Sequence, residues 1–190
     1  MQVLPSGDQL GRYRIDRVLD AGPDVVTYAA DDPRLRRTVV LSVVGSGATG
    51  TADRTAELRA AATRLSGLSS PYVAQVHDHE VEGERVYVVS QYVPGGDLAT
   101  WLTRHGPLPR HHALRIAEQV AAGLADAHRH GVTHDDLGPR HVLVRDPGTD
   151  RAHAWVADFP LLDADRGSVD GDLRGVGRVL LAALTGAGPG

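Results

Sequence analysis

The feature that most constrains the fold of this chain is a change in hydrophobic pattern at Gly95-Gly96. Before this point, short runs rich in β-branched residues are separated by polar turns, which is typical of strands. After it, apolar residues recur at the three- and four-residue spacing of helices. The pattern therefore predicts an α+β protein in which a β part precedes a mainly helical part.

The β part, residues 11–93, contains candidate strands at 13–19, 25–29, 38–44, 73–76 and 85–91. The last two flank an acidic turn at 82–84 and are expected to form an antiparallel hairpin. Asp53 is a suitable N-cap for a helix that ends near Leu65. The sequence thus predicts a five-stranded antiparallel sheet with one helix, preceded by an N-terminal extension at residues 1–10.

The helical part, residues 94–190, is expected to begin with a short helix that Asp97 caps. Leu114, Val120 and Leu124 recur at helical spacing within a long amphipathic helix. The predicted elements are helices at 97–103, 111–130 and 173–184, and strands at 142–144 and 154–157.

Composition excludes several classes of function. The net charge is −4, with basic residues scattered among acidic ones, so neither nucleic acid nor an anionic membrane is an expected partner. There is no cysteine, which fits a cytoplasmic location. No apolar run approaches the roughly 18 residues of a membrane span. We expect a cytoplasmic domain, either free or as the cytosolic part of a membrane protein.

All 20 basic residues are Arg, and the chain contains neither Lys nor Asn. Any chemistry that needs one of these two side chains is therefore excluded, whatever motif surrounds the position.

Several short motifs follow one another in an informative order. They are Leu19-Asp-Ala-Gly22, Val39-Val-Leu-Ser42, Val88-Val-Ser-Gln-Tyr-Val-Pro-Gly-Gly96, His134-Asp-Asp136 and Asp158-Phe-Pro160. In this order they resemble the eukaryotic-type Ser/Thr protein kinase fold over about residues 11–186. The resemblance implies a bilobal fold with a five-stranded N-lobe and a mainly helical C-lobe. Only about eleven residues, 161–171, separate Pro160 from the last helix, so we expect a truncated C-lobe that lacks the activation segment and the later helices.

The N-lobe positions depart from the family pattern. Of the three glycines of the phosphate-binding loop, only Gly22 is kept. Ser42 stands at the place of the strand Lys, and Ala61 at the place of its Glu partner. The loss of both charges together is physically reasonable, because either charge alone would be buried without its partner and would carry a large desolvation penalty.

The C-lobe positions are only partly kept. Asp136 and Asp158 match the catalytic base and the magnesium ligand, although Asp136 could equally hold a tight turn. Gly138 replaces the loop Lys, and His141 replaces the Asn that binds a second metal ion. His134 and Phe159 match the packing residues of the family. Pro160 is a further departure, because it stands in place of a Gly.

These substitutions predict a protein that is not an enzyme, with no catalytic, cofactor or metal residue and with ATP and magnesium binding weak or absent. The alternative is a nucleotide-binding or residually active atypical Ser/Thr kinase that uses Asp136 and Asp158. A transition-metal site is not expected either, because the spacing of the candidate ligands matches no compact ligand motif. These candidates are His128, His130, His134 and His141, with Asp135 and Asp136.

Within the kinase-like proteins, the chain most resembles the cytoplasmic pseudokinase domain of actinobacterial MviN-type proteins, which are linked to peptidoglycan precursor export. That resemblance implies a scaffold that an active Ser/Thr kinase phosphorylates and that a forkhead-associated domain then binds. The candidate phosphorylation sites are the loop residues Thr49, Thr51 and Thr149.

Overall fold

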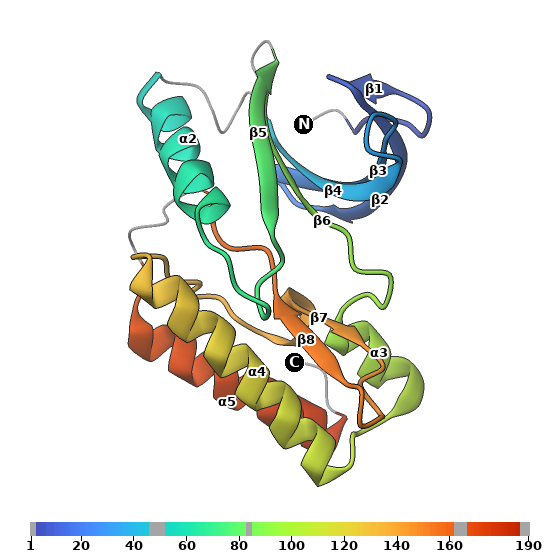
Figure 1. The fold of residues 1–190 in the computed structure, drawn as a ribbon, viewed down its shortest axis with the longest axis vertical. Helices are drawn as coiled ribbons and strands as arrows, with labels where there is room; N and C mark the ends of the chain where they lie inside the picture. Colours follow the sequence, from blue (N-terminus) through green and yellow to red (C-terminus); the bar gives the residue numbers. More distant parts are fainter. Residues whose placement is uncertain (1–2, 46–51, 83–84, 162–166, 187–190) are drawn as a thin grey trace. The chain divides into compact units, whose positions relative to one another are not determined.

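The structure is a computed structural model that describes residues 3–45, 52–82, 85–161 and 167–186. It divides into two compact units (Figure 1). The first unit comprises residues 1–67 and 75–92, and the second comprises residues 68–74 and 93–190.

The first unit is a curled antiparallel sheet with one helix (Figure 1). The strand order is β1-β2-β3-β4-β6-β5, and helix α2 (Ala52–Ser66) contacts β5 and β6. The strands are β1 (Gln9–Leu10), β2 (Tyr13–Ala21), β3 (Val25–Asp32), β4 (Arg37–Val44), β5 (Val76–Glu82) and β6 (Arg85–Gln91).

Two details of this sheet differ from the sequence prediction. The short strand β1 adds a sixth member at the edge, where it pairs with β2. The strand expected at 73–76 instead begins at Val76 and continues through a charged stretch to Glu82. Val73 forms an isolated bridge with Val156 in the second unit. Ladder pairing with β6 decides the position of β5, because its side chains have little apolar content.

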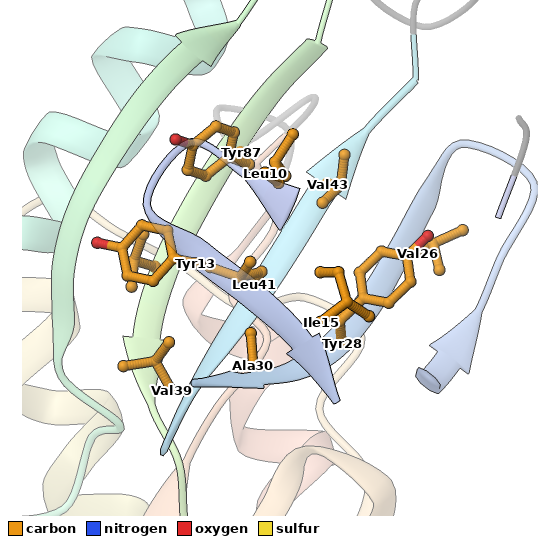
Figure 2. Close-up of a cluster of buried hydrophobic side chains, with 11 residues drawn as sticks. Leu10, Tyr13, Ile15, Val26, Tyr28, Ala30, Val39, Leu41, Val43 and Tyr87 are labelled. Carbon is orange, nitrogen blue, oxygen red and sulfur yellow. The ribbon is translucent and has the colours of Figure 1, made fainter. Parts of the chain in front are cut away.

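The core of the first unit contains three fully buried tyrosines, Tyr13, Tyr28 and Tyr87 (Figure 2). The rings of Tyr13 and Tyr87 meet edge to face with centroids 6.2 Å apart, a favourable aromatic geometry. The Tyr28 hydroxyl accepts a hydrogen bond from the Leu4 N–H at 3.0 Å, and the Tyr87 hydroxyl donates to Glu80 at 2.6 Å. These bonds give two of the three buried hydroxyls a partner, as burial of polar groups requires.

The second unit is mainly helical, with a two-stranded hairpin against its longest helix (Figure 1). Helix α4 contacts both α5 and β8. The elements are α3 (Leu98–His105), α4 (Arg110–Arg129), the 3₁₀ turn η1 (Pro139–His141), β7 (Val142–Arg145), β8 (His153–Val156) and α5 (Val169–Thr185). All five predicted helices and strands of this part are confirmed to within a few residues.

Side-chain caps explain where two of these helices begin. Asp97 accepts the Thr100 N–H at 2.8 Å at the start of α3, as the sequence predicted. Ser168 accepts the Gly171 N–H at 3.0 Å at the start of α5. At the end of α5, Gly186 adopts a left-handed conformation with φ 70°, the usual backbone of a C-terminal glycine.

Among the described residues, no helix is both long enough and apolar enough to cross a membrane.

Candidate active site

The segment His134-Asp-Asp136 lies in a loop that a buried carboxylate holds in place. Asp172, from the first turn of α5, has no exposed surface. It accepts the N–H of His134 at 3.0 Å and the N–H of Asp135 at 2.6 Å. Its Oδ2 atom also lies 2.6 Å from Nε2 of His128 on α4. One carboxylate thus fixes the loop to two helices, with its own charge satisfied by donors.

His134 packs inside this loop and does not face solvent. Its Nε2 donates to the carbonyl of Ala157 at 2.9 Å. Its ring lies 5.1 Å from the ring of Phe159 and 5.1 Å from the ring of His141, centroid to centroid. Burial lowers the pKa of His134, so the ring is neutral at physiological pH. His134 thus contributes buried ring contacts and one backbone hydrogen bond.

Asp136 and Asp158 are both exposed, each at one end of the segment that His134 organises. The Asp136 N–H donates to the His134 carbonyl at 2.7 Å, which tightens the turn. The next residue, Leu137, is buried, and its carbonyl accepts two bonds from Arg178 at 2.8 and 3.2 Å. Asp158 has a left-handed backbone with φ 59°, which is uncommon outside glycine. Hydrogen bonds thus hold the turn around Asp136, and Asp136 and Asp158 are both exposed residues.

The remaining candidate residues of the second unit lie at the 3₁₀ turn η1 and after β8. Gly138 precedes the 3₁₀ turn η1, and its carbonyl accepts the N–H of His141 at 3.0 Å. The His141 carbonyl in turn accepts the Ala157 N–H at 2.9 Å. Pro160 is partly buried and directly follows the buried Phe159.

The predicted N-lobe positions all lie in the first unit. Gly22 closes the turn between β2 and β3, where its N–H donates to the Val25 carbonyl at 2.9 Å. Ser42 lies on β4, paired with Thr27 on one side and Val88 on the other. Ala61 is buried on α2.

The chemistry of these residues decides which ligands of a kinase they could hold. Asp158 offers an exposed carboxylate, the type of ligand that magnesium prefers. His141 offers an imidazole, which suits a hard cation poorly. The neutral hydroxyl of Ser42 carries no charge for phosphate. The residues fit one divalent cation at Asp158 and do not fit a second cation or a charged phosphate clamp on β4.

Of the three predicted phosphorylation sites, only Thr149 lies among the described residues; Thr49 and Thr51 lie outside them. Thr149 is exposed in the turn between β7 and β8. Its hydroxyl donates to the Asp146 carbonyl at 2.9 Å and accepts the Arg151 N–H at 3.1 Å.

The anchoring role of Asp172 was not predicted from the sequence. The one available signal was a carboxylate at the start of a helix that is otherwise apolar enough to be buried. A buried carboxylate needs donors, but nothing in the sequence shows that they come from His128, His134 and Asp135.

With this geometry in hand, comparison with known proteins identifies the class. The pattern of the protein tyrosine and serine/threonine kinase family matches residues 25–170, about three quarters of the chain. The chain therefore belongs to this family. The predicted kinase-like fold class is confirmed.

Curated relatives carry the names of serine/threonine-protein kinases. PknD of Mycobacterium tuberculosis is 32% identical over 159 residues, which are 83% of this chain and 23% of PknD. PrkC of Bacillus subtilis is 30% identical over 154 residues, 81% of this chain and 23% of PrkC. PknL of M. tuberculosis is 31% identical over 153 residues, 80% of this chain and 37% of PknL. The chain thus spans less than two fifths of the length of these relatives.

These relatives overturn one prediction. The absence of Lys, of Asn and of an activation segment led us to expect a protein that is not an enzyme, whereas the relatives are named protein kinases. The prediction was wrong because it weighed single missing side chains above the relationship that the rest of the sequence carries.

Solved structures support the fold. The crystal structure of the M. tuberculosis PknI kinase domain superposes with a TM-score of 0.79 at 21% identity, covering 99% of this chain and 80% of that chain.

Proposed function

We propose that the chain is part of an atypical Ser/Thr protein kinase that uses Asp136 and Asp158. The observation that carries this proposal is the anchoring of the His134-Asp-Asp136 loop by the buried Asp172, which leaves the Asp136 carboxylate exposed. Kinship with named Ser/Thr kinases supports the same assignment.

In this proposal the substrate hydroxyl oxygen attacks the γ-phosphorus of ATP, ADP leaves, and Asp136 accepts the hydroxyl proton, the part that an Asp plays in kinase catalytic loops. Asp158 would hold one magnesium ion, which neutralises the charge of the phosphates when bound. Ser42 supplies no cation, so nucleotide affinity and turnover should both be low compared with kinases that carry a Lys there. Weak nucleotide binding thus remains our expectation.

The test is transfer of labelled γ-phosphate from ATP to a Ser/Thr peptide in the presence of Mg²⁺ or Mn²⁺. Asp136→Asn should reduce the rate about 10²- to 10⁴-fold, the usual effect of losing a general base. Asp135→Asn is the matched control, since Asp135 is the adjacent exposed carboxylate and its left-handed backbone tolerates Asn. Equal rates for the two variants, or no transfer by the unaltered chain, would contradict the proposal.

The position of Thr149 supports a second candidate function, phosphorylation-dependent docking. A phosphate on this exposed residue would add negative charge and strong acceptors at a turn whose backbone is already fixed. An active Ser/Thr kinase would add the phosphate, and a forkhead-associated domain would bind it through positively charged side chains. Regulation of peptidoglycan synthesis, in the cytoplasm beside an MviN-type membrane protein, is the setting that the sequence resemblance suggests.

This docking proposal has its own test, independent of turnover. The chain is treated with an active Ser/Thr kinase, the modified residue is found by mass spectrometry, and binding of a forkhead-associated domain is measured. Thr149→Val should abolish binding, whereas Thr185→Val, which removes another exposed Thr, should leave it intact. Binding that survives Thr149→Val, or a chain that stays unmodified at Thr149, would refute this assignment.

A further inference from the structure

Two segments far apart in sequence bring three metal-ligating side chains together in the second unit. His111 and His112 lie in the first turn of α4, and Asp150 lies in the turn between β7 and β8. One ligand atom from each residue lies within 4.8 Å of the other two. We propose that His111, His112 and Asp150 form a binding site for a first-row transition-metal ion of the Zn²⁺ type.

The strongest evidence is the environment of His112. The residue is 7% exposed, and neither ring nitrogen has a hydrogen-bond partner among the described residues. A buried polar group without a partner is unfavourable and calls for an explanation. A metal ion on Nε2 would occupy one of the two nitrogens and would explain why a polar ring is buried there.

The distances fit a shared ion better than a direct hydrogen bond. Nε2 of His112 lies 3.5 Å from Oδ1 of Asp150, beyond the usual range of an N–H···O bond. Two ligands that each lie about 2.0 Å from a tetrahedral zinc ion are about 3.3 Å apart. The rings of His111 and His112 have centroids 3.9 Å apart, so the second imidazole is beside the first. The three donor atoms lie within 4.8 Å of one another, so side-chain rotation would be needed to bring them to one ion.

The turn that carries Asp150 is fixed against α4 before any ion binds. Arg115 of α4 donates to the backbone carbonyl of Asp150. Gln119, one turn further along α4, donates to the Ala152 carbonyl at 3.2 Å and accepts the Ala154 N–H at 2.7 Å. The backbone of Thr149 and Ala152 closes the turn itself. The backbone that carries Asp150 is therefore already ordered, so ion binding restricts mainly side-chain freedom.

The donor set indicates the class of metal. Two imidazoles and one carboxylate suit Zn²⁺ and similar ions, whereas Mg²⁺ prefers oxygen ligands alone. Three protein ligands leave a fourth position open for water or another ligand. The Arg115 charge and the positive end of the α4 dipole oppose a cation here, so we expect moderate rather than tight affinity. The site is also distinct from the candidate active site, because the 20-residue helix α4, about 30 Å long, separates His111 from the loop that follows Arg129.

The experiment measures Co²⁺ and Zn²⁺ binding to the whole chain. Each chain should bind one Co²⁺ ion, with the visible absorption of a low-coordinate site. Zn²⁺ should displace the bound Co²⁺, whereas excess Mg²⁺ should not. Asp150→Asn and His111→Ala alter exposed residues and should keep the fold, yet each should weaken Zn²⁺ affinity by at least about tenfold.

The matched control is His130→Ala, which removes another exposed histidine at the opposite end of α4. It should bind Zn²⁺ as the unaltered chain does. Three results would overturn the proposal: no saturable binding of Co²⁺ or Zn²⁺, unchanged affinity in both Asp150→Asn and His111→Ala, or an equal loss in His130→Ala. Because the readout is binding alone, the outcome does not depend on whether the chain transfers phosphate.

Discussion

Removing the Asp172 carboxylate should lower the free energy of unfolding of the second unit by about 3–5 kcal/mol, the range measured when one partner of a buried charged contact is deleted. The structure gives the same magnitude from its parts. Asp172→Ala leaves the N–H groups of His134 and Asp135 without their acceptor, at about 1–3 kcal/mol for each. The ring of His128 loses its partner as well.

Urea denaturation followed by tryptophan fluorescence suits this measurement. The chain has two tryptophans, Trp101 and Trp155, and both lie in the second unit. Asp170→Ala is the control, because Asp170 is exposed in the same first turn of α5 and should contribute no more than about 1 kcal/mol through the helix dipole.

A double-mutant cycle with His128→Ala separates the free energy of the Asp172–His128 contact from that of the bonds between Asp172 and the loop. If the 2.6 Å contact matters, Asp172→Ala and His128→Ala should couple by about 0.5–3 kcal/mol. If Asp172→Ala unfolds at the same urea concentration as Asp170→Ala, Asp172 does not anchor the loop.

Two further predictions concern pH and close packing. Burial lowers the pKa of His134 below its ordinary value of 6.5, so the unfolded chain binds more protons and stability should fall as pH drops below 6.5. His134→Gln should reduce the loss of urea midpoint between pH 7.5 and 5.5. The exposed His77, whose pKa desolvation and the charge of Arg37 also lower, accounts for part of the remainder. Gly123→Ala would place a methyl group 2.5 Å from the Tyr72 carbonyl and should destabilise by about 1–3 kcal/mol. Gly177→Ala on α5 meets no atom within 4 Å and should stabilise by about 0.5–1 kcal/mol, so thermal melts in which both glycine variants shift in the same direction would contradict the packing.

The sequence predicted most elements of the fold because their residues carry a strong local pattern. Arg37–Val44 is β-branched along most of its length, and Asp97 has a side chain that suits a helix start. The strand Gln9–Leu10 was missed because two residues show no periodicity. The start of β5 was misplaced because Val73 is apolar while the true strand carries His and acidic side chains.

The candidate site was predictable where it depends on motif order and not where it depends on tertiary contacts. Asp136 and Asp158 were identified from short motifs. The bond from the Asp135 N–H to Asp172 spans 37 residues, and the approach of His112 to Asp150 spans a helix and a hairpin. No local sequence pattern predicts such pairs of distant residues. The same limit explains the error about enzymatic activity, which rested on positions judged one at a time.

The strand order of the sheet in the first unit also affects the tendency of this protein to aggregate at high concentration. Its two edges are β1 and β5, and an exposed strand edge can pair with another chain and start aggregation. β1 offers only two residues for such pairing. β5 carries Asp78, Glu80 and Glu82, whose negative charges would repel a second copy of the same strand. Neither edge is therefore a good template for intermolecular β-sheet growth.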